Sequence, residues 1–348
     1  MQTLVRNGLE NVRVDSVNPL VPPGELKDKL PGSDRCREVV EFGRRTFSDI
    51  LNGRDKRLAV VVGPCSIHDP EAAIEYARRL KKLSDSVQDR YFILMRVYFE
   101  KPRTTVGWKG LINDPCMDES CDIEKGLEIA RKLLVDIAEI GLPAATEFLD
   151  PVIPQFIADL ISWSAIGART TESQTHREMA SGLSMPVGFK NGTDGAVQTA
   201  IDAMAAARIP HSFLGIDRQG RTSIVKTKGN PDCHLVMRGG RTGPNYQLEH
   251  IQSASGTISK SGIPPRIMVD CSHANSGKKP QNQPNVWEDI HKQRSDASEP
   301  SPIFGAMIES FLEGGNQSIP ADLTQLTYGK SVTDGCLSWE ETEKLFLS

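Results

Sequence analysis

Short runs of apolar and β-branched residues recur along the chain from Leu58 onward. Such continuous runs are typical of parallel strands that are buried on both faces. Stretches with helical spacing separate most of the runs, which indicates βαβ units. Eight runs within about 250 residues favour a closed TIM (β/α)8 barrel of the α/β class over an open sheet. The predicted strands are 58–62, 92–97, 144–148, 165–168, 186–189, 235–237, 267–269 and 303–308.

Helices are predicted between these strands from apolar residues spaced three and four positions apart. They are expected at 70–83, 124–140, 154–162, 174–182 and 194–208. Residues 211–226 instead predict a β-hairpin, inserted after the fifth helix, that turns at Arg218-Gln219-Gly220. Two long polar stretches, 98–122 and 274–301, are rich in Pro, Gly, Asn and Asp. We predict that both are functional loops, since loops of this length often carry function.

The first 57 residues differ in pattern from the rest of the chain. The segment 18–24 holds three prolines and predicts a turn-rich connector. Residues 34–52 then carry apolar positions at helical spacing and predict an amphipathic helix. We therefore divide the chain into an N-terminal extension, 1–57, and a barrel, 58–348. The extension is expected to provide oligomer or regulatory contacts.

Composition and charge exclude several classes of protein. The 348 residues are 38% hydrophobic and 25% charged, which argues against disorder, and the net charge of −4 argues against a basic nucleic-acid binder. No apolar run approaches the roughly 18 residues that a membrane span needs, and the N-terminus has no secretory signal. The seven cysteines are an odd number without a C-x-x-C pair. A cytoplasmic protein without a disulfide framework is therefore expected.

Charged side chains follow almost every predicted strand. In a barrel, the C-terminal ends of all strands meet at one face, where active sites are built. Arginine matches the geometry of carboxylates and phosphates, and lysine adds point charges, so this group predicts binding of two phosphates and a carboxylate. The alternative is structural pairing with Glu147, Asp150, Glu172 and Asp270. The cationic residues are Arg96, Lys101, Arg103, Arg169, Lys190 and Arg238.

A second group combines a thiol, an imidazole and two carboxylates. Cys65, His273 and Glu309 each follow a strand that closes the barrel, and Asp334 lies in the next loop. These donors suit a divalent transition metal such as Mn, Fe, Co or Zn. Each residue also has a structural interpretation: Cys65 as a small buried residue, His273 as a hydrogen-bonded core residue, and Asp334 as a turn residue before glycine.

His68 and Asp69 compete with Cys65 for a place in this group. Both are metal-capable residues that lie within four positions of the thiol. The run His68-Asp69-Pro70 is more typical of the cap of the first barrel helix, because Asp is a preferred N-cap residue and Pro a preferred first helical residue.

Five motifs resemble type I 3-deoxy-D-arabino-heptulosonate 7-phosphate (DAHP) synthase. The resemblance covers the chain from about Pro22 to Glu343, and its motifs are long and multiple. The motifs are GPCSIHD from Gly63, RVYFEKPRT from Arg96, GARTTES from Gly167, GFKNGTDG from Gly188 and SHAN from Ser272.

The resemblance implies a transferase that condenses phosphoenolpyruvate with erythrose 4-phosphate, the first committed step of the shikimate pathway to chorismate and the aromatic amino acids. It implies that a divalent metal is held by the four residues of the second group. Phosphoenolpyruvate would be bound by Arg96, Lys101, Arg169, Lys190 and Arg238. Erythrose 4-phosphate would be bound by Lys101, Pro102, Arg103, Thr104 and Asp334. The expected catalytic residues are Lys101, Glu147, Lys190 and Asp334, with Glu147 and Lys190 both candidates for proton transfer.

Two alternative functions stay open at this point. One is another phosphoenolpyruvate-condensing synthase that acts on a different sugar phosphate, although the run from Lys101 to Thr104 favours erythrose 4-phosphate. The other is a non-catalytic barrel that binds an anionic metabolite, since a fold alone does not imply a function. All four candidate metal ligands are present, which favours the enzyme.

The resemblance also implies a homo-oligomer, dimer or tetramer, that is inhibited by an aromatic amino acid. The family's inhibitor pocket corresponds to Pro154, Gln155, Leu183, Ser184, Phe213 and Gly215. In relatives, glycine at the position of Gly215 accompanies sensitivity to tyrosine, and serine accompanies sensitivity to phenylalanine. Glycine leaves room for the phenolic hydroxyl of tyrosine. We therefore predict inhibition by tyrosine.

Overall fold

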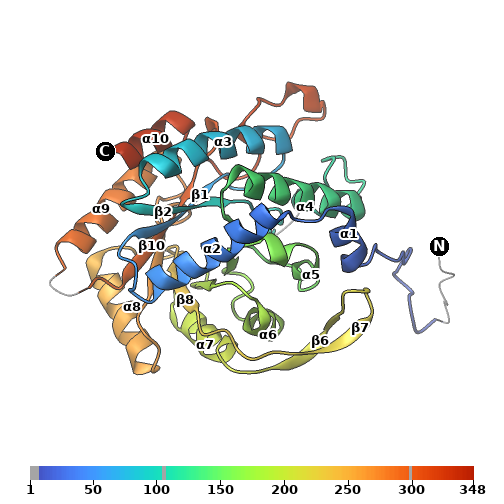
Figure 1. The fold of residues 1–348 in the computed structure, drawn as a ribbon, viewed down its shortest axis with the longest axis horizontal. Helices are drawn as coiled ribbons and strands as arrows, with labels where there is room; N and C mark the ends of the chain where they lie inside the picture. Colours follow the sequence, from blue (N-terminus) through green and yellow to red (C-terminus); the bar gives the residue numbers. More distant parts are fainter. Residues whose placement is uncertain (1–7, 104–106, 298–299) are drawn as a thin grey trace.

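A computed structural model describes residues 8–103, 107–297 and 300–348. Its main strands are β1 (Leu58–Gly63), β2 (Tyr91–Arg96), β3 (Ala144–Glu147), β4 (Trp163–Ile166), β5 (Val187–Lys190), β8 (Cys233–Met237), β9 (Ile267–Asp270) and β10 (Ile303–Glu309). They are parallel and close into a barrel in the order β1-β10-β9-β8-β5-β4-β3-β2 (Figure 1). The predicted TIM barrel is therefore confirmed, with each strand within three residues of its expected bounds.

Helices cover the outside of the barrel. They are α3 (Pro70–Ser86), α4 (Ile123–Ile140), α5 (Pro154–Ile157) with the 3-10 turn η1 (Ala158–Leu160), α6 (Gln174–Gly182), α7 (Gln198–Ala207), α8 (Leu248–Lys260), α9 (Gln283–Ser295) and α10 (Trp339–Leu347). The prediction of a loop over 274–301 is wrong in its second half, where η2 (Pro280–Asn282) leads into α9. Only four residues of α9 are buried, so its apolar periodicity is weak. Among the described helices, none combines the length and apolarity that crossing a bilayer requires.

The N-terminal end of the barrel is closed by α2 (Asp34–Leu51), the helix predicted at 34–52. Ser33 caps it, because its hydroxyl accepts a hydrogen bond from the Cys36 backbone N–H at 3.1 Å. Phe47, Ile50 and Leu51 of α2 join one core cluster with the inward-facing strand residues. Gly43 permits this close approach, since a Cβ there would lie 2.5 Å from Ser162 Oγ.

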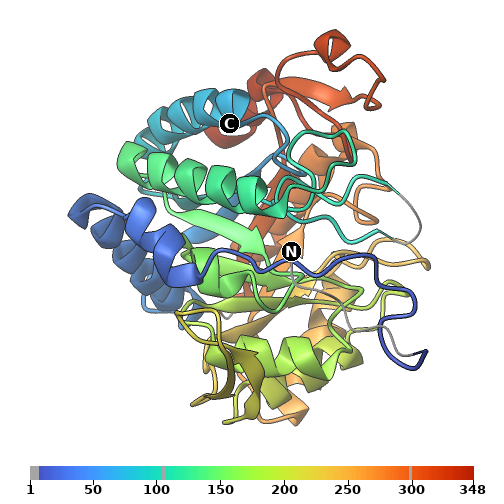
Figure 2. The same cartoon turned by 90° about the vertical axis from the view of Figure 1, so that its right-hand side faces the viewer.

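The predicted hairpin is confirmed as β6 (Ser212–Ile216) paired antiparallel with β7 (Thr222–Lys226). Figure 2 shows this yellow hairpin below the blue N-terminal helices. The segment 18–24 is not only a connector, because the helix α1 (Pro23–Lys29) begins within it at a proline, a favoured first helical residue. Gly24 N donates to Arg218 O at 2.7 Å, so α1 docks on the hairpin turn.

Candidate active site

One end of the barrel collects the charged residues that follow the strands. A cavity of about 190 Å³ opens there. Thr104 of the predicted substrate loop lies outside the described residues. Eleven of the predicted site residues line the cavity: Arg96, Lys101, Pro102, Arg103, Glu147, Arg169, Lys190, Arg238, His273, Glu309 and Asp334. The structure thus brings the residues of both predicted groups to one place.

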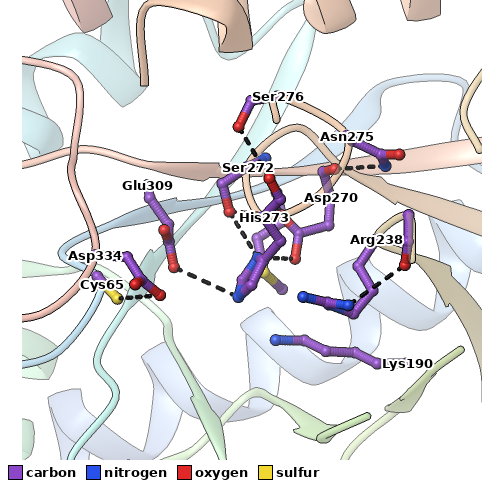
Figure 3. Close-up of polar contacts among 12 residues, drawn as sticks. Cys65, Lys190, Arg238, Asp270, Ser272, His273, Asn275, Ser276, Glu309 and Asp334 are labelled. Carbon is purple, nitrogen blue, oxygen red and sulfur yellow. Dashed lines mark hydrogen bonds and ion pairs between the residues drawn. The ribbon is translucent and has the colours of Figure 1, made fainter. Parts of the chain in front are cut away.

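The metal-capable residues gather on one side of this cavity (Figure 3). Cys65, Glu309 and Asp334 each bring a donor atom to within 4.8 Å of the others. His273 adjoins them, with its Nε2 4.0 Å from Glu309 Oε1. The short paired strands β11 (Glu313–Asn316) and β12 (Lys330–Ser331) return the chain to the cavity and place Asp334 there. A sulfur, a nitrogen and carboxylate oxygens together suit a divalent transition metal.

Hydrogen bonds behind His273 orient its ring. His273 Nδ1 lies 2.9 Å from Asp270 Oδ2 and 2.7 Å from Ser272 Oγ. Burial acts to raise the pKa of the Asp270 carboxyl, but His273 outweighs it and holds the pKa well below its ordinary value. Asp270 and Ser272 therefore hold the Nδ1 side of the ring, which leaves Nε2 directed toward the metal-capable group. An imidazole nitrogen and a carboxylate that face each other at 4.0 Å are two ligand types that a divalent metal accepts, so these residues fit a metal.

Lys101 connects the metal-capable residues to the cationic side of the cavity. Its Nζ donates to Cys65 Sγ at 3.0 Å and to Cys65 O at 3.4 Å. Burial raises the pKa of the Cys65 thiol, and Glu309 adds to that rise. Burial acts to lower the pKa of Lys101, but Cys65 and Glu309 outweigh it, so Lys101 stays protonated. Lys101 opposes the rise in the pKa of Cys65 but does not reverse it, so a bound divalent cation would be needed to favour the thiolate at Cys65.

Arg96, the last residue of β2, lies fully buried beneath the cavity. Its Nη2 donates to Glu309 Oε1 at 3.0 Å, and its Nε donates to Pro64 O at 3.0 Å. The guanidinium carbon is 3.5 Å from the centre of the Tyr98 ring, a cation–π contact. Burial acts to lower the pKa of Arg96, but Tyr98 and Glu309 hold it above its ordinary value. Arg96 is thus permanently charged. Its acidic partner is Glu309, which was not among the four acidic residues considered as pairing partners from the sequence.

Lys190 and Glu147 form a second buried ion pair. The Lys190 Nζ donates to Glu147 Oε2 at 3.0 Å. Burial acts to raise the pKa of Glu147, but Lys190 outweighs it and the net shift is downward. The structural alternative of ion pairing therefore holds for this pair. It does not hold for Lys101, Arg103 and Arg238, which have no carboxylate oxygen within 4.0 Å among the residues that the structure describes.

His68 and Asp69 lie apart from the metal-capable group, as the cap interpretation predicted. Asp69 Oδ1 accepts from the backbone N–H groups of Glu71 at 2.9 Å and Ala72 at 3.1 Å, which caps α3. His68 is buried with its ring centroid 6.1 Å from that of Phe311. The cap role is therefore confirmed for Asp69, and His68 packs beside Phe311.

Comparison with known proteins agrees with this geometry. A profile of the DAHP synthetase I family matches residues 33–346. The chain belongs to this family. It is 54% identical over 340 residues to the Tyr-sensitive phospho-2-dehydro-3-deoxyheptonate aldolase of Escherichia coli, covering 98% of this chain and 95% of that protein. It is 53% identical over 336 residues to the Phe-sensitive enzyme of Escherichia coli, covering 97% and 95%. The solved phospho-2-dehydro-3-deoxyheptonate aldolase of Francisella tularensis superposes with a TM-score of 0.93 at 50% identity over 96% of each chain.

As a type I DAHP synthase, the protein condenses phosphoenolpyruvate with erythrose 4-phosphate and water to give DAHP and phosphate. It is a transferase of the shikimate pathway, in which chorismate and the aromatic amino acids are made. Both alternative functions considered from the sequence are set aside, because the relatives named above are DAHP synthases over nearly the whole chain. DAHP synthases depend on a metal, and Cys65, Glu309 and Asp334 bring ligand atoms close enough together to hold one.

Sequence reasoning missed several residues of this DAHP synthase that line the cavity: Tyr98, Glu100, Ser272, Lys278 and Gln283. The first two alternate with Arg96 along one extended stretch, so the period of two could have found them. Burial raises the pKa of Glu100 to about 8. Gln283 exchanges two hydrogen bonds of 2.9 Å with the Glu309 backbone and so fixes the position of Glu309. No signal marked Gln283, because it begins the unpredicted helix α9.

The expected inhibitor residues lie outside the barrel on three elements. Pro154 and Gln155 begin α5, Leu183 and Ser184 follow α6, and Phe213 and Gly215 belong to β6. The helix α6 packs against β6, and α5 packs against α1. Figure 1 shows α5, α6 and the hairpin on the same side of the molecule.

Proposed function

We propose the following division of labour within this DAHP synthase. Cys65, His273, Glu309 and Asp334 hold one divalent metal, chosen from Mn, Fe, Co and Zn. The carboxylate and phosphate of phosphoenolpyruvate are bound by Arg96, Lys101, Arg169, Lys190 and Arg238. Erythrose 4-phosphate is bound by Lys101, Pro102, Arg103, Thr104 and Asp334. The observation that best supports this proposal is the 3.0 Å contact between Lys101 Nζ and Cys65 Sγ. This contact places the proposed metal site directly beside the proposed anion-binding residues.

The residues then perform the condensation by orientation and charge. When bound, the metal supplies Lewis acidity toward the aldehyde oxygen of erythrose 4-phosphate. The cations hold both phosphates so that C3 of phosphoenolpyruvate faces the aldehyde carbon, and such orientation can supply about 7 kcal/mol or more. C3 forms the new carbon–carbon bond, water adds at C2, and the C–O bond to phosphate breaks. We assign proton transfer to the pair Lys190 and Glu147, whose polar atoms are 3.0 Å apart.

A phosphate-release assay with both substrates tests the metal assignment. Chelation should abolish turnover, and addition of Mn²⁺ or another divalent ion should restore it. Comparison of the four ions at equal occupancy then identifies the most active metal. Full turnover of the metal-free protein would overturn the assignment.

We further propose that tyrosine inhibits the enzyme. Overall identity to the Tyr-sensitive and Phe-sensitive relatives differs by one percentage point, so it does not separate the two specificities. The argument therefore depends on Gly215, where the cross-strand neighbour is close: a Cβ there would lie 2.8 Å from Val225 Cγ2. Glycine adds no side chain to the pocket beside Val225, and the absence of a side chain favours the larger inhibitor, tyrosine. Pro154, Gln155, Leu183, Ser184 and Phe213 would form the rest of the pocket.

Inhibition curves with the three aromatic amino acids test this proposal. Tyrosine should inhibit most strongly, phenylalanine less and tryptophan little. Gly215→Ser should shift the preference toward phenylalanine, whereas Thr222→Ala, an exposed residue on the opposite face of the same hairpin, should leave it unchanged. Strongest inhibition of the unchanged enzyme by phenylalanine or tryptophan would contradict the proposal.

The N-terminal extension completes this regulatory proposal. We place it between subunits of a homo-oligomer, dimer or tetramer, because residues 9–20 carry exposed apolar side chains: Leu9, Val12, Val14, Val17 and Leu20. Removal of the first 20 or so residues should relieve inhibition and keep much of the activity.

We also propose a cytoplasmic location, since all seven cysteines are free thiols and the site needs Cys65 reduced.

A further inference from the structure

Lys278 is a seventh cationic side chain at the cavity, and neither half of the proposed site uses it. The cavity is lined by seven Lys or Arg side chains and four carboxylates. Lys278 is exposed at the rim of the cavity, as Arg103 is, whereas Arg96 and Lys190 are buried at its base. Its position therefore suits the outer end of a bound substrate.

A tight turn places Lys278 beside the metal-capable residues. Lys278 N donates to His273 O at 2.7 Å, and Gly277 N donates to Ala274 O at 3.0 Å. Both His273 and Lys278 have left-handed backbone conformations, with φ of 54° and 60°. Such conformations are uncommon for residues other than glycine and persist where surrounding contacts impose them, often at functional sites. The turn thus ties the position of Lys278 to that of His273.

The charge of Lys278 acts on the cavity and is not neutralised by a neighbour. Lys278 and Asp334 both line this cavity. Among the described residues, no carboxylate oxygen lies within 4.0 Å of Lys278 Nζ. A cation without an acidic partner at the edge of a cavity attracts anions.

We propose that Lys278, with Arg103, binds the phosphate of erythrose 4-phosphate. The inference depends on the proposed division of the site. The aldehyde at C1 must approach the side of Asp334, so the phosphate on C4 extends away from the base of the cavity toward the exposed rim. The anions of phosphoenolpyruvate are instead matched by the buried cations below. Lys278 is thus a specificity-determining residue for the length and charge of the aldehyde substrate.

The test uses Lys278→Asn, because asparagine tolerates the left-handed backbone while the charge and the reach of the lysine side chain are lost. The KM for erythrose 4-phosphate should rise about tenfold, as expected for a lost charge-assisted hydrogen bond. The KM for phosphoenolpyruvate should change less than twofold. Lys278→Arg, which keeps the charge, should keep the KM for erythrose 4-phosphate of the unchanged enzyme. The matched control is Lys279→Asn, since Lys279 is adjacent and exposed but does not line the cavity.

Three outcomes would overturn the inference: an unchanged KM for erythrose 4-phosphate in Lys278→Asn, an equal rise in Lys279→Asn, or a rise confined to phosphoenolpyruvate. Arg103→Ala, measured in parallel, separates this failure from that of the proposed division. If Arg103→Ala raises the KM for erythrose 4-phosphate and Lys278→Asn does not, only the role of Lys278 fails. If neither does, the division of the site fails as well.

Discussion

At the N-terminal end of the barrel, α2 seals the interior with aromatic and aliphatic side chains, whereas the C-terminal end holds charged groups around an open cavity. Both ends bury polar atoms, but they satisfy them differently. At the sealed end, the Trp163 Nε1–H donates to His234 Nε2 at 3.1 Å, and the His234 Nδ1–H donates to Asp232 O at 3.1 Å. These neutral groups complete one another without a ligand.

The open end leaves its polar groups incomplete. Cys65, Glu309 and Asp334 bring electron-rich atoms within 4.8 Å of one another, and several nearby cations have no acidic partner among the described residues. Such an arrangement destabilises the protein without ligands and favours the binding of a metal and of anions. The comparison teaches that changes at the sealed end should alter stability, and changes at the open end should alter function.

The largest effect is expected from Phe47→Ala at the sealed end. Phe47 is fully buried against Trp163, His234 and Phe304, with ring centroids 5.7–6.0 Å away. The cavity left behind should lower the free energy of unfolding by about 3–5 kcal/mol. Urea unfolding measures this change, and the kcat of the folded fraction should stay within twofold. A large fall in kcat without a fall in stability would contradict the comparison.

A fall in pH should lower the free energy of unfolding through His234, which is buried at the sealed end of the barrel. Burial lowers the pKa of His234 to about 4, so the unfolded state, with an ordinary pKa near 6.5, binds the proton first. Stability from this group is therefore complete above pH 6.5 and falls by roughly 3 kcal/mol as the pH decreases toward 4. The free energy of unfolding measured from pH 7 to 4.5 should fall less steeply in His234→Gln. Equal slopes in the two proteins would exclude this role for His234.

Cys65→Ala should separate function from stability at the open end. Loss of the thiol should reduce kcat by about 100-fold or more, comparable to the loss of a group that stabilises charge in a transition state. Bound metal, measured after dialysis, should fall in parallel. The free energy of unfolding of the metal-free protein should change by less than about 1 kcal/mol, because a small group leaves a crowded cluster. Cys336→Ala, a neighbouring buried thiol outside the proposed ligand set, is the control and should keep its metal.

Substitution of Arg103 or Arg169 should have a smaller effect and should distinguish the two substrate sites at the open end. Arg103→Ala should raise the KM for erythrose 4-phosphate by about 10- to 100-fold, the value of a charge-assisted hydrogen bond, and should affect phosphoenolpyruvate less. Arg169→Ala should do the reverse. Steady-state kinetics with each substrate varied in turn measure both values. If both variants shift both KM values equally, the open end is a single anion site.

Local patterns in the sequence determined the architecture and the position of the chemistry. Apolar runs marked all eight strands, and parallel strands in a barrel bring their C-terminal ends together, so residues far apart in the chain could be assigned to one face. The hairpin and α2 were visible for the same reason, because periodicity is a property of neighbouring residues. By contrast, α9 buries only four of its residues and α1 spans seven, which left both below the level that periodicity detects.

Only the tertiary structure decided which groups touch. Cys65 and Asp334 are separated by 269 positions yet lie 3.8 Å apart, and Arg96 reaches Glu309 across 213 positions. Asp270 determines which nitrogen of His273 faces the metal-capable group, and a left-handed turn brings Lys278 to the rim. Sequence reasoning placed most of these residues at the correct end of the barrel but not in their pairs. The physical reason is that a pair depends on side-chain direction and burial, which arise only when distant strands close the barrel.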